Sequence, residues 1–192
     1  MKKIYQQIWK LALPYYKKGR YGDTHHIEWM MKEANQIIKK EKLDDSIFLP
    51  LVILHDIGYA MVKKDNPFKL DLRKAHMKEG AILAEQILNQ INYPKNKTKI
   101  ITYYISVHDN WAFKDYKIFK KDKLLGIFND LDFTWMFTPK GFNIVRSFLK
   151  YSPKEMVDYL IKQRLPTRGF FSSKISEQIY KKYFKKIEKH KT

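Results

Sequence analysis

Cysteine is absent from this 192-residue chain, and so is any long run of apolar residues. Without cysteine there is no disulfide, thiolate metal ligand or cysteine nucleophile, so a metal must be held by histidine and carboxylate side chains. The longest strongly apolar run, residues 47–54, is far shorter than the roughly 20 residues that a membrane-spanning helix requires. We therefore expect no membrane span. Because polar residues also interrupt the N-terminal segment where a signal-peptide core would lie, we expect a cytoplasmic location.

Acidic residues are scarce relative to basic ones. The chain has 38 Lys and Arg residues against 20 Asp and Glu residues, which gives a formal net charge of +18. This balance favours anionic partners such as nucleotides, nucleic acids or acidic membranes. Most of the basic residues are lysines, however, whereas proteins that read nucleic acids tend to use arginine. We favour AT-rich coding bias over nucleic-acid binding as the explanation of the lysine excess.

The residues that are present predict a single all-α domain over 1–192. Hydrophobic residues make up 44% of the chain, enough for a buried core. They recur at spacings of three and four, while the alternation typical of strands is scarce. Breaks at Pro and Gly and the apolar spacing predict helices over residues 4–16, 27–38, 47–57, 71–91, from Pro94 to about 108, 120–137, 142–149, 153–165 and from 174 onward.

Some boundary residues carry a specific expectation. Asp23 is a candidate N-cap for the second helix, and Asp44, Asp45 and Ser46 are candidates for the third, short and almost wholly apolar helix. Pro50 is tolerable in that helix only near its first turn, and Gly58 is expected to end it. Pro139 is expected to break the chain before the helix over 142–149.

Ionisable side chains interrupt the apolar faces of several predicted helices. Buried ionisable groups are costly unless they are paired or bound to a cation, and several that converge from separate helices suit a metal ion. The histidines and aspartates in such positions are His26, His55, Asp56, His76, His108 and Asp132. Together they predict a metal site.

The adjacent pair His55 and Asp56 lies near the end of the central apolar helix predicted over 47–57. Successive helix residues point about 100° apart, so both side chains can reach one ion only near a helix end. The approaching Gly58 supplies such an end. Taken alone, the dipeptide fits a buried histidine with a satisfied aspartate equally well.

The order of these residues resembles that of the HD-domain superfamily of metal-dependent phosphohydrolases. The likeness covers residues 22–137 and includes THHIEWMMKEA, LVILHDIGYA, KAHMKEGAILAEQIL, ITYYISVHDN and GIFNDLDF. It implies an all-α helical bundle, with the helices over 142–188 packed on this motif core. It also implies a metal ion held by His26, His55, Asp56 and Asp132.

Two further histidines match positions that bind a second metal or the substrate phosphate in several branches of the family. These are His76 and His108. Gly80, one turn after His76, would let another helix or a ligand approach that face closely. The competing interpretation is that His76 is an ordinary surface histidine.

Two ligand positions have neighbours that compete for the same role. His26 is preferred to His25 because apolar residues follow it at four and eight positions, as in the family. Asp132 is preferred to Asp130 because the family's final aspartate usually follows a small or apolar residue, and here Leu131 precedes Asp132.

The chain departs from the family pattern at two places. Many relatives have a lysine that contacts phosphate where this chain has Tyr59, so Lys63 or Lys64 must make that contact or the substrate is handled differently. After His108 the chain reads Asp109-Asn110-Trp111 rather than the signature of the cyclic-dinucleotide branch, which is therefore disfavoured.

The resemblance implies hydrolysis of a phosphate monoester or diester, in a nucleotide or similar small molecule, by a metal-activated water. The ion would be Mn, Fe, Ni, Co, Zn or Mg, in one or two copies, with Asp56 bridging if there are two. His76 and His108 would be second-site ligands, or would hydrogen-bond the phosphate and protonate the leaving group. The alternative is a basic nucleic-acid-associated binding protein whose metal site is structural.

Overall fold

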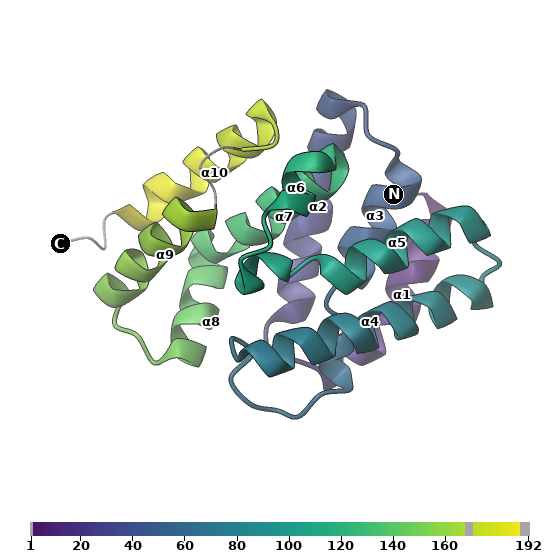
Figure 1. Ribbon diagram of the computed structural model, residues 1–192, viewed down its shortest axis with the longest axis horizontal. Coiled ribbons are helices and arrows are strands. Elements are labelled where there is room, and N and C mark those ends of the chain that lie inside the picture. The colour runs from purple at the N-terminus through teal and green to yellow at the C-terminus, as the bar shows by residue number, and fades with distance from the viewer. Residues whose placement is uncertain (1, 168–170, 189–192) are drawn as a thin grey trace. The chain divides into compact units, whose positions relative to one another are not determined.

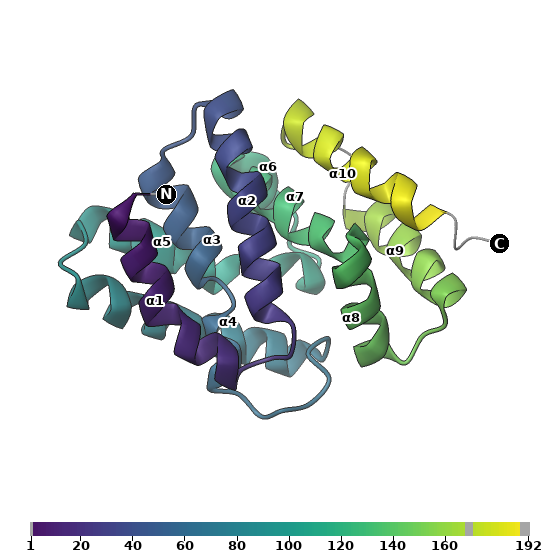
Figure 2. The same cartoon turned by 180° about the vertical axis from the view of Figure 1, so that it is seen from behind.

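The computed structural model describes residues 2–167 and 171–188, and within these ranges every regular element is a helix (Figures 1 and 2). The all-α fold predicted from the apolar spacing is therefore confirmed. None of the described helices combines the length and the apolar character needed to cross a membrane.

The chain divides into two compact units, residues 1–113 and residues 114–192. The predicted motif core, 22–137, extends across this boundary. The prediction of one domain, with the C-terminal helices packed on the motif core, stays a prediction.

The first unit is built around α3. Its elements are α1 (Lys3–Lys18), α2 (Asp23–Glu41), α3 (Asp45–Leu54), the 3-10 turn η1 (Ile57–Ala60), α4 (Leu70–Gln90), α5 (Lys95–Val107) and the 3-10 turn η2 (Asn110–Phe113). Residues 48–54 of α3 are all buried, and α1, α2 and α5 pack against this helix. The long helices α4 and α5 lie side by side in both views (Figures 1 and 2).

The short central helix α3 contains Pro50, which was expected near the first turn of the helix. The helix begins at Asp45, earlier than predicted, and of the three candidate caps it is Asp44 whose side chain accepts a hydrogen bond, from the Ser46 N–H. Pro50, however, lies in the second turn and has no N–H to donate to the carbonyl of Ser46. The hydroxyl of Tyr93 donates to that carbonyl instead, at 2.7 Å. The expectation for Pro50 was wrong because a side chain from outside the helix satisfies the carbonyl.

The second unit contains α6 (Lys117–Lys121), α7 (Lys123–Thr134), the 3-10 turn η3 (Trp135–Phe137), α8 (Pro139–Leu149), α9 (Pro153–Thr167) and α10 (Lys174–Ile187). The single helix predicted over 120–137 was wrong in its extent, because Asp122 leaves the helical conformation and caps α7 by accepting the N–H of Leu125. Pro139 does not break the chain but starts α8, where a missing N–H costs nothing.

The interior of the second unit is aromatic. Phe137 is fully buried, and its ring centroid lies 4.8 Å from that of Tyr180 on α10. The ring of Tyr180 also stacks against Phe184, with centroids 5.5 Å apart. These contacts, together with those between α10 and α7, hold the second unit together.

Candidate metal centre

His55 and Asp56 occupy the turn between α3 and η1. The helix ends at Leu54, earlier than predicted, and Asp56 has left the helical conformation with φ −100° and ψ 3°. Gly58 therefore lies inside η1 and does not end α3. Both side chains are buried, with His55 0% and Asp56 4% exposed. Leaving the helix at this point lets two successive side chains point into the same space.

Two glycines allow this turn to lie directly on α4. A Cβ atom added to Gly58 would sit 2.0 Å from the carbonyl oxygen of His76 and 2.5 Å from the nitrogen of Gly80, so no other residue fits there without a shift of the backbone. Gly80 in turn faces the carbonyl oxygen of His55. The close approach predicted at Gly80 is confirmed. The turn that carries His55 lies against α4, the helix that carries both His76 and Gly80.

Four histidines surround the carboxylate of Asp56. Its Oδ2 atom lies 3.5 Å from Nδ1 of His26 and 3.4 Å from Nε2 of His55. Its Oδ1 atom lies 3.4 Å from Nε2 of His76 and 3.5 Å from Nε2 of His108. The four rings are buried and come from α2, the end of α3, α4 and the end of α5. Each oxygen of Asp56 therefore faces its own pair of histidines.

Three of these histidines are anchored to the backbone through Nδ1. A carbonyl oxygen only accepts hydrogen bonds, so Nδ1 must carry the proton and Nε2 keeps its lone pair in the neutral ring. This anchoring is the usual support of a histidine that binds metal through Nε2. The bonds run from His55 to Val52 at 3.1 Å, from His76 to Leu72 at 3.3 Å and from His108 to Ile105 at 2.7 Å.

The contact between His76 and His108 points to a shared cation. Their Nε2 atoms are 3.2 Å apart. With both rings neutral and protonated at Nδ1, two lone pairs would face each other, an arrangement that a proton or metal ion between them relieves. Burial lowers the pKa of His76, although Asp56 opposes this shift, so the ring favours the neutral form that binds metal.

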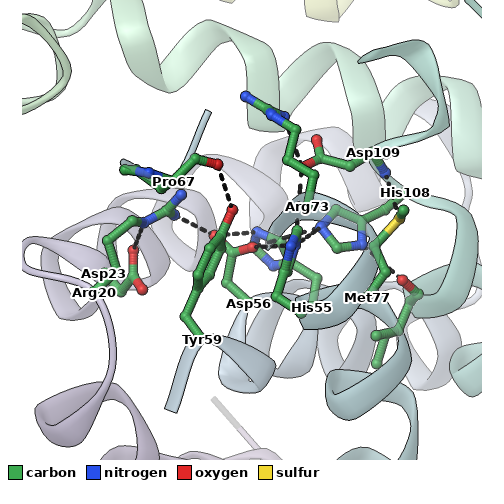
Figure 3. A network of polar contacts seen from close by, with 12 residues as sticks. Arg20, Asp23, His55, Asp56, Tyr59, Pro67, Arg73, Met77, His108 and Asp109 are labelled. Atoms are coloured by element: carbon green, nitrogen blue, oxygen red, sulfur yellow. Dashed lines mark hydrogen bonds and ion pairs between the residues drawn. The ribbon is translucent and has the colours of Figure 1, made fainter. Parts of the chain in front are cut away.

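An arginine links two carboxylates at the edge of the cluster (Figure 3). Arg20, in the turn before α2, donates from Nε to Asp23 Oδ1 at 2.7 Å and from Nη2 to Asp56 Oδ2 at 2.5 Å. Asp23 was expected to cap α2, but Gly22 holds the N-cap position and Asp23 points to Arg20. Burial opposes ionisation of Asp56, yet the electrostatic interactions of its carboxylate with His55 and Arg20 outweigh this effect and hold the pKa of Asp56 well below its usual range.

A second arginine lies on the other side of the cluster. Nη1 of Arg73 donates to Oδ2 of Asp109 at 2.6 Å, and the same oxygen is 3.8 Å from Nε2 of His76 (Figure 3). The guanidinium also lies 4.7 Å from the ring centroid of Trp111 and 5.1 Å from that of Phe68. The Arg73–Asp109 pair is buried, so it fixes Asp109 beside the histidines.

The sequence interpretation missed Arg20, Asp23, Arg73 and Asp109. Two signals were present. Asp23 precedes His26 by three residues and so shares its helix face, and Asp109 makes a second His-Asp dipeptide with His108. The arginines gave little signal, because the contact of each with the cluster is to an aspartate 36 residues away, although Arg20 also pairs with Asp23 three residues on.

The first unit brings together five of the predicted site residues: His26, His55, Asp56, His76 and His108. His76 is fully buried and is not a surface histidine. His25 is exposed, so His26 is the buried member of that pair, as expected.

Asp132 belongs to the second unit. It lies on α7 and is half-buried, and its role as a metal ligand stays a prediction. Its competitor Asp130 is buried within the same unit, where its Oδ2 accepts the N–H of Ser172 at 2.7 Å.

The donor atoms of the first unit suit a divalent ion. Sets of three residues have one ligand atom each within 4.8 Å of the others, and these atoms are imidazole nitrogens and carboxylate oxygens. Such mixed donors favour first-row transition metals and Zn, and accept Mg if waters complete the shell. The sets are His55, Asp56 and His108; His76, His108 and Asp109; and Asp23, His26 and Asp56.

Comparisons of the chain with protein-family models, curated proteins and solved structures found no match. Membership of the HD-domain superfamily therefore stays a prediction that depends on the order of the residues in the sequence.

Proposed function

We propose that this protein is a metal-dependent phosphohydrolase that acts on a nucleotide or a similar small phosphate ester. The observation that carries the proposal is the position of Asp56, whose two carboxylate oxygens each face a pair of buried histidines at 3.4–3.5 Å. A carboxylate placed in this way is suited to bridge two ions. One or two ions of Mn, Fe, Ni, Co, Zn or Mg would supply a water of lowered pKa and polarise a phosphoryl oxygen.

The proposed metal ligands form two groups, one for each carboxylate oxygen of Asp56. His26 and His55, together with Asp132 as predicted from sequence, would hold the first ion. On the other side, the Nε2 atoms of His76 and His108 would hold a second ion. With a single ion, a proton shared between the same two nitrogens would let one of them hydrogen-bond the phosphate and deliver that proton to the leaving oxygen.

We do not assign phosphate binding to Tyr59, which occupies the position where many members of the HD-domain superfamily have lysine. Its ring is buried and stacks on His76 with centroids 4.0 Å apart, and its hydroxyl donates to the carbonyl of Pro67. Lys63 and Lys64 are exposed in the loop that follows η1 and remain the candidates for contact with phosphate. The net charge of +18 favours the approach of an anionic substrate.

The test couples metal analysis to a phosphatase screen. Purified protein is analysed for bound first-row metals, stripped with a chelator, reloaded with each candidate ion and assayed against nucleotides and model phosphate esters. We expect the stripped protein to keep its helices, lose turnover and regain it on reloading. A protein that unfolds when stripped, hydrolyses nothing and binds RNA or DNA with a steep salt dependence would support the nucleic-acid-binding alternative.

A further inference from the structure

Arg20 donates a hydrogen bond to a carboxylate oxygen that the proposed metal site also needs. Its Nη2 lies 2.5 Å from Oδ2 of Asp56, the oxygen that faces His26 and His55. A divalent ion bound between those histidines would draw on the same lone pairs. The guanidinium and the ion carry charge of the same sign, so they cannot both bind this oxygen closely without mutual repulsion.

A second acceptor for Arg20 is available nearby. Asp23 already accepts from Nε of Arg20 through Oδ1, while its Oδ2 is buried and makes no hydrogen bond with any residue in the described part of the chain. A buried carboxylate oxygen left in this way is costly. If Nη2 moved from Asp56 to this oxygen, Arg20 and Asp23 would form a bidentate pair, which is the strong geometry for guanidinium and carboxylate.

The surroundings of Arg20 permit this small movement. Its Nε bond to Asp23 would be kept, and its guanidinium lies 4.2 Å from the ring centroid of Tyr59, a face on which a planar cation can slide. The Arg20 side chain is 20% exposed, so one edge of it reaches solvent.

We propose that Arg20 is an internal competitor for the metal ion: it holds Oδ2 of Asp56 when no ion is bound, and transfers Nη2 to Oδ2 of Asp23 when an ion takes the carboxylate. Arg20 thus stabilises a buried cluster that would otherwise be left with an uncompensated carboxylate, and lowers the affinity for metal in return. Asp23 is a positioning residue that receives the arginine. This inference rests on the metal site of the proposed function.

The test measures Mn²⁺ binding by titration calorimetry in the full chain, without any substrate. In Arg20→Gln the competitor is gone, so Mn²⁺ affinity should rise on the order of tenfold, a usual scale for coupling between two ligands. Lys18→Gln removes an equal charge from an exposed position two residues away and should leave the affinity unchanged. An affinity in Arg20→Gln that is equal to or weaker than that of the unmodified protein would overturn the proposal.

Asp23→Asn supplies a second test that keeps Arg20. Its amide cannot form a bidentate ion pair, so Arg20 should stay on Asp56 and Mn²⁺ affinity should fall. In the double variant with Arg20→Gln, the Asp23→Asn substitution should have little further effect. If it instead weakens binding by the same factor with and without Arg20, then Asp23 acts as a ligand itself and the proposal fails.

Folding is checked by circular dichroism. If Arg20→Gln does not fold, Arg20→Lys replaces it, because one ammonium cannot span both carboxylates as the guanidinium does; a rise in Mn²⁺ affinity would support the proposal and no rise would overturn it. If the unmodified protein binds Mn²⁺ and the Arg20 variants show no rise in Mn²⁺ affinity, only the role of Arg20 is wrong. If the unmodified protein binds no divalent ion at all, the proposed function is wrong as well.

Discussion

The two units bury different kinds of polar group. In the first unit the buried polar residues are mainly titratable and face one another, as the histidines around Asp56 do. In the second unit many of them bond to the local backbone. Thr134 donates to the carbonyl of Asp130 one turn earlier, and Thr138 caps α8 by accepting the N–H of Gly141. The first arrangement is costly unless a cation completes it, whereas hydrogen bonds of the second kind need no cation.

This difference predicts different effects of substitutions in the two units. The second unit gains its stability from aromatic packing, so we expect truncation of its buried side chains to lower the free energy of unfolding. The first unit also has an apolar core helix, α3, but its buried charged cluster is weak evidence for added stability relative to apolar packing. We therefore expect substitutions in that cluster to act most strongly on metal binding and turnover, although removing one charge leaves its partner uncompensated and also costs stability.

The sharpest test of this contrast is Asp56→Ala. The variant removes the carboxylate that faces both histidine pairs, so hydrolysis should fall below detection and bound metal should be lost, while most of the helical signal remains. Turnover, metal content and circular dichroism are measured together. Asp65→Ala removes an exposed carboxylate and should change none of them. Full turnover with unchanged metal content in Asp56→Ala would refute the proposed role of the cluster.

The matching test in the second unit is Phe137→Ala. Phe137 is fully buried against Tyr180, and loss of a buried phenylalanine side chain costs about 3–5 kcal/mol. Denaturant unfolding measures this change. Phe113→Ala, at a position 39% exposed, serves as the control and should cost far less. A small effect at Phe137 would mean that the aromatic cluster is not what stabilises the second unit.

Two histidine variants sharpen the comparison within the first unit. His76→Ala and His108→Ala should each lower the rate by about two decades, or about 2.7 kcal/mol in activation free energy, with the fold retained. Loss of one metal equivalent would make the residue a second-site ligand, whereas full metal content would make it a phosphate contact or proton donor. His25→Ala, at an exposed position, should have no effect. Turnover at the normal rate in both variants would leave these histidines structural.

The smallest expected effect belongs to Tyr93→Phe. The variant leaves the Ser46 carbonyl without the hydroxyl that replaces the missing N–H of Pro50, which should cost about 1 kcal/mol in the free energy of unfolding. Tyr103→Phe, at an exposed position, is the control. Burial raises the pKa of Tyr93 from 10.0 to about 12, so the contribution of the hydroxyl is present below pH 10 and is lost as the pH rises through 12.

Much of the fold could be predicted from the sequence, because buried helix faces impose a repeat of 3.6 residues on the apolar side chains. Helix ends were less predictable. Asp122 and Asp23 are both good N-cap residues, yet only Asp122 caps a helix, because Arg20 engages Asp23. That choice depends on tertiary contacts that spacing does not encode.

The site was predictable in part for the same reason. His26, His76 and His108 are regularly spaced intrusions on apolar faces, so the periodic pattern exposes them. Arg20 lies in a turn with no periodicity, and the burial of its partner Asp56 is decided by packing around α3. The role of Arg20 therefore became visible only in three dimensions.

The glycine contact between η1 and α4 has a consequence for ion size. Gly58 meets the backbone of His76 and Gly80 directly, and a contact between two main chains cannot relax by a rotamer change. The backbone next to Asp56 is thus held against the backbone of α4. If this centre binds a metal ion as proposed, we expect it to favour small ions such as Mn²⁺, Zn²⁺ or Mg²⁺ over Ca²⁺, whose longer bonds and larger shell need a site that can widen.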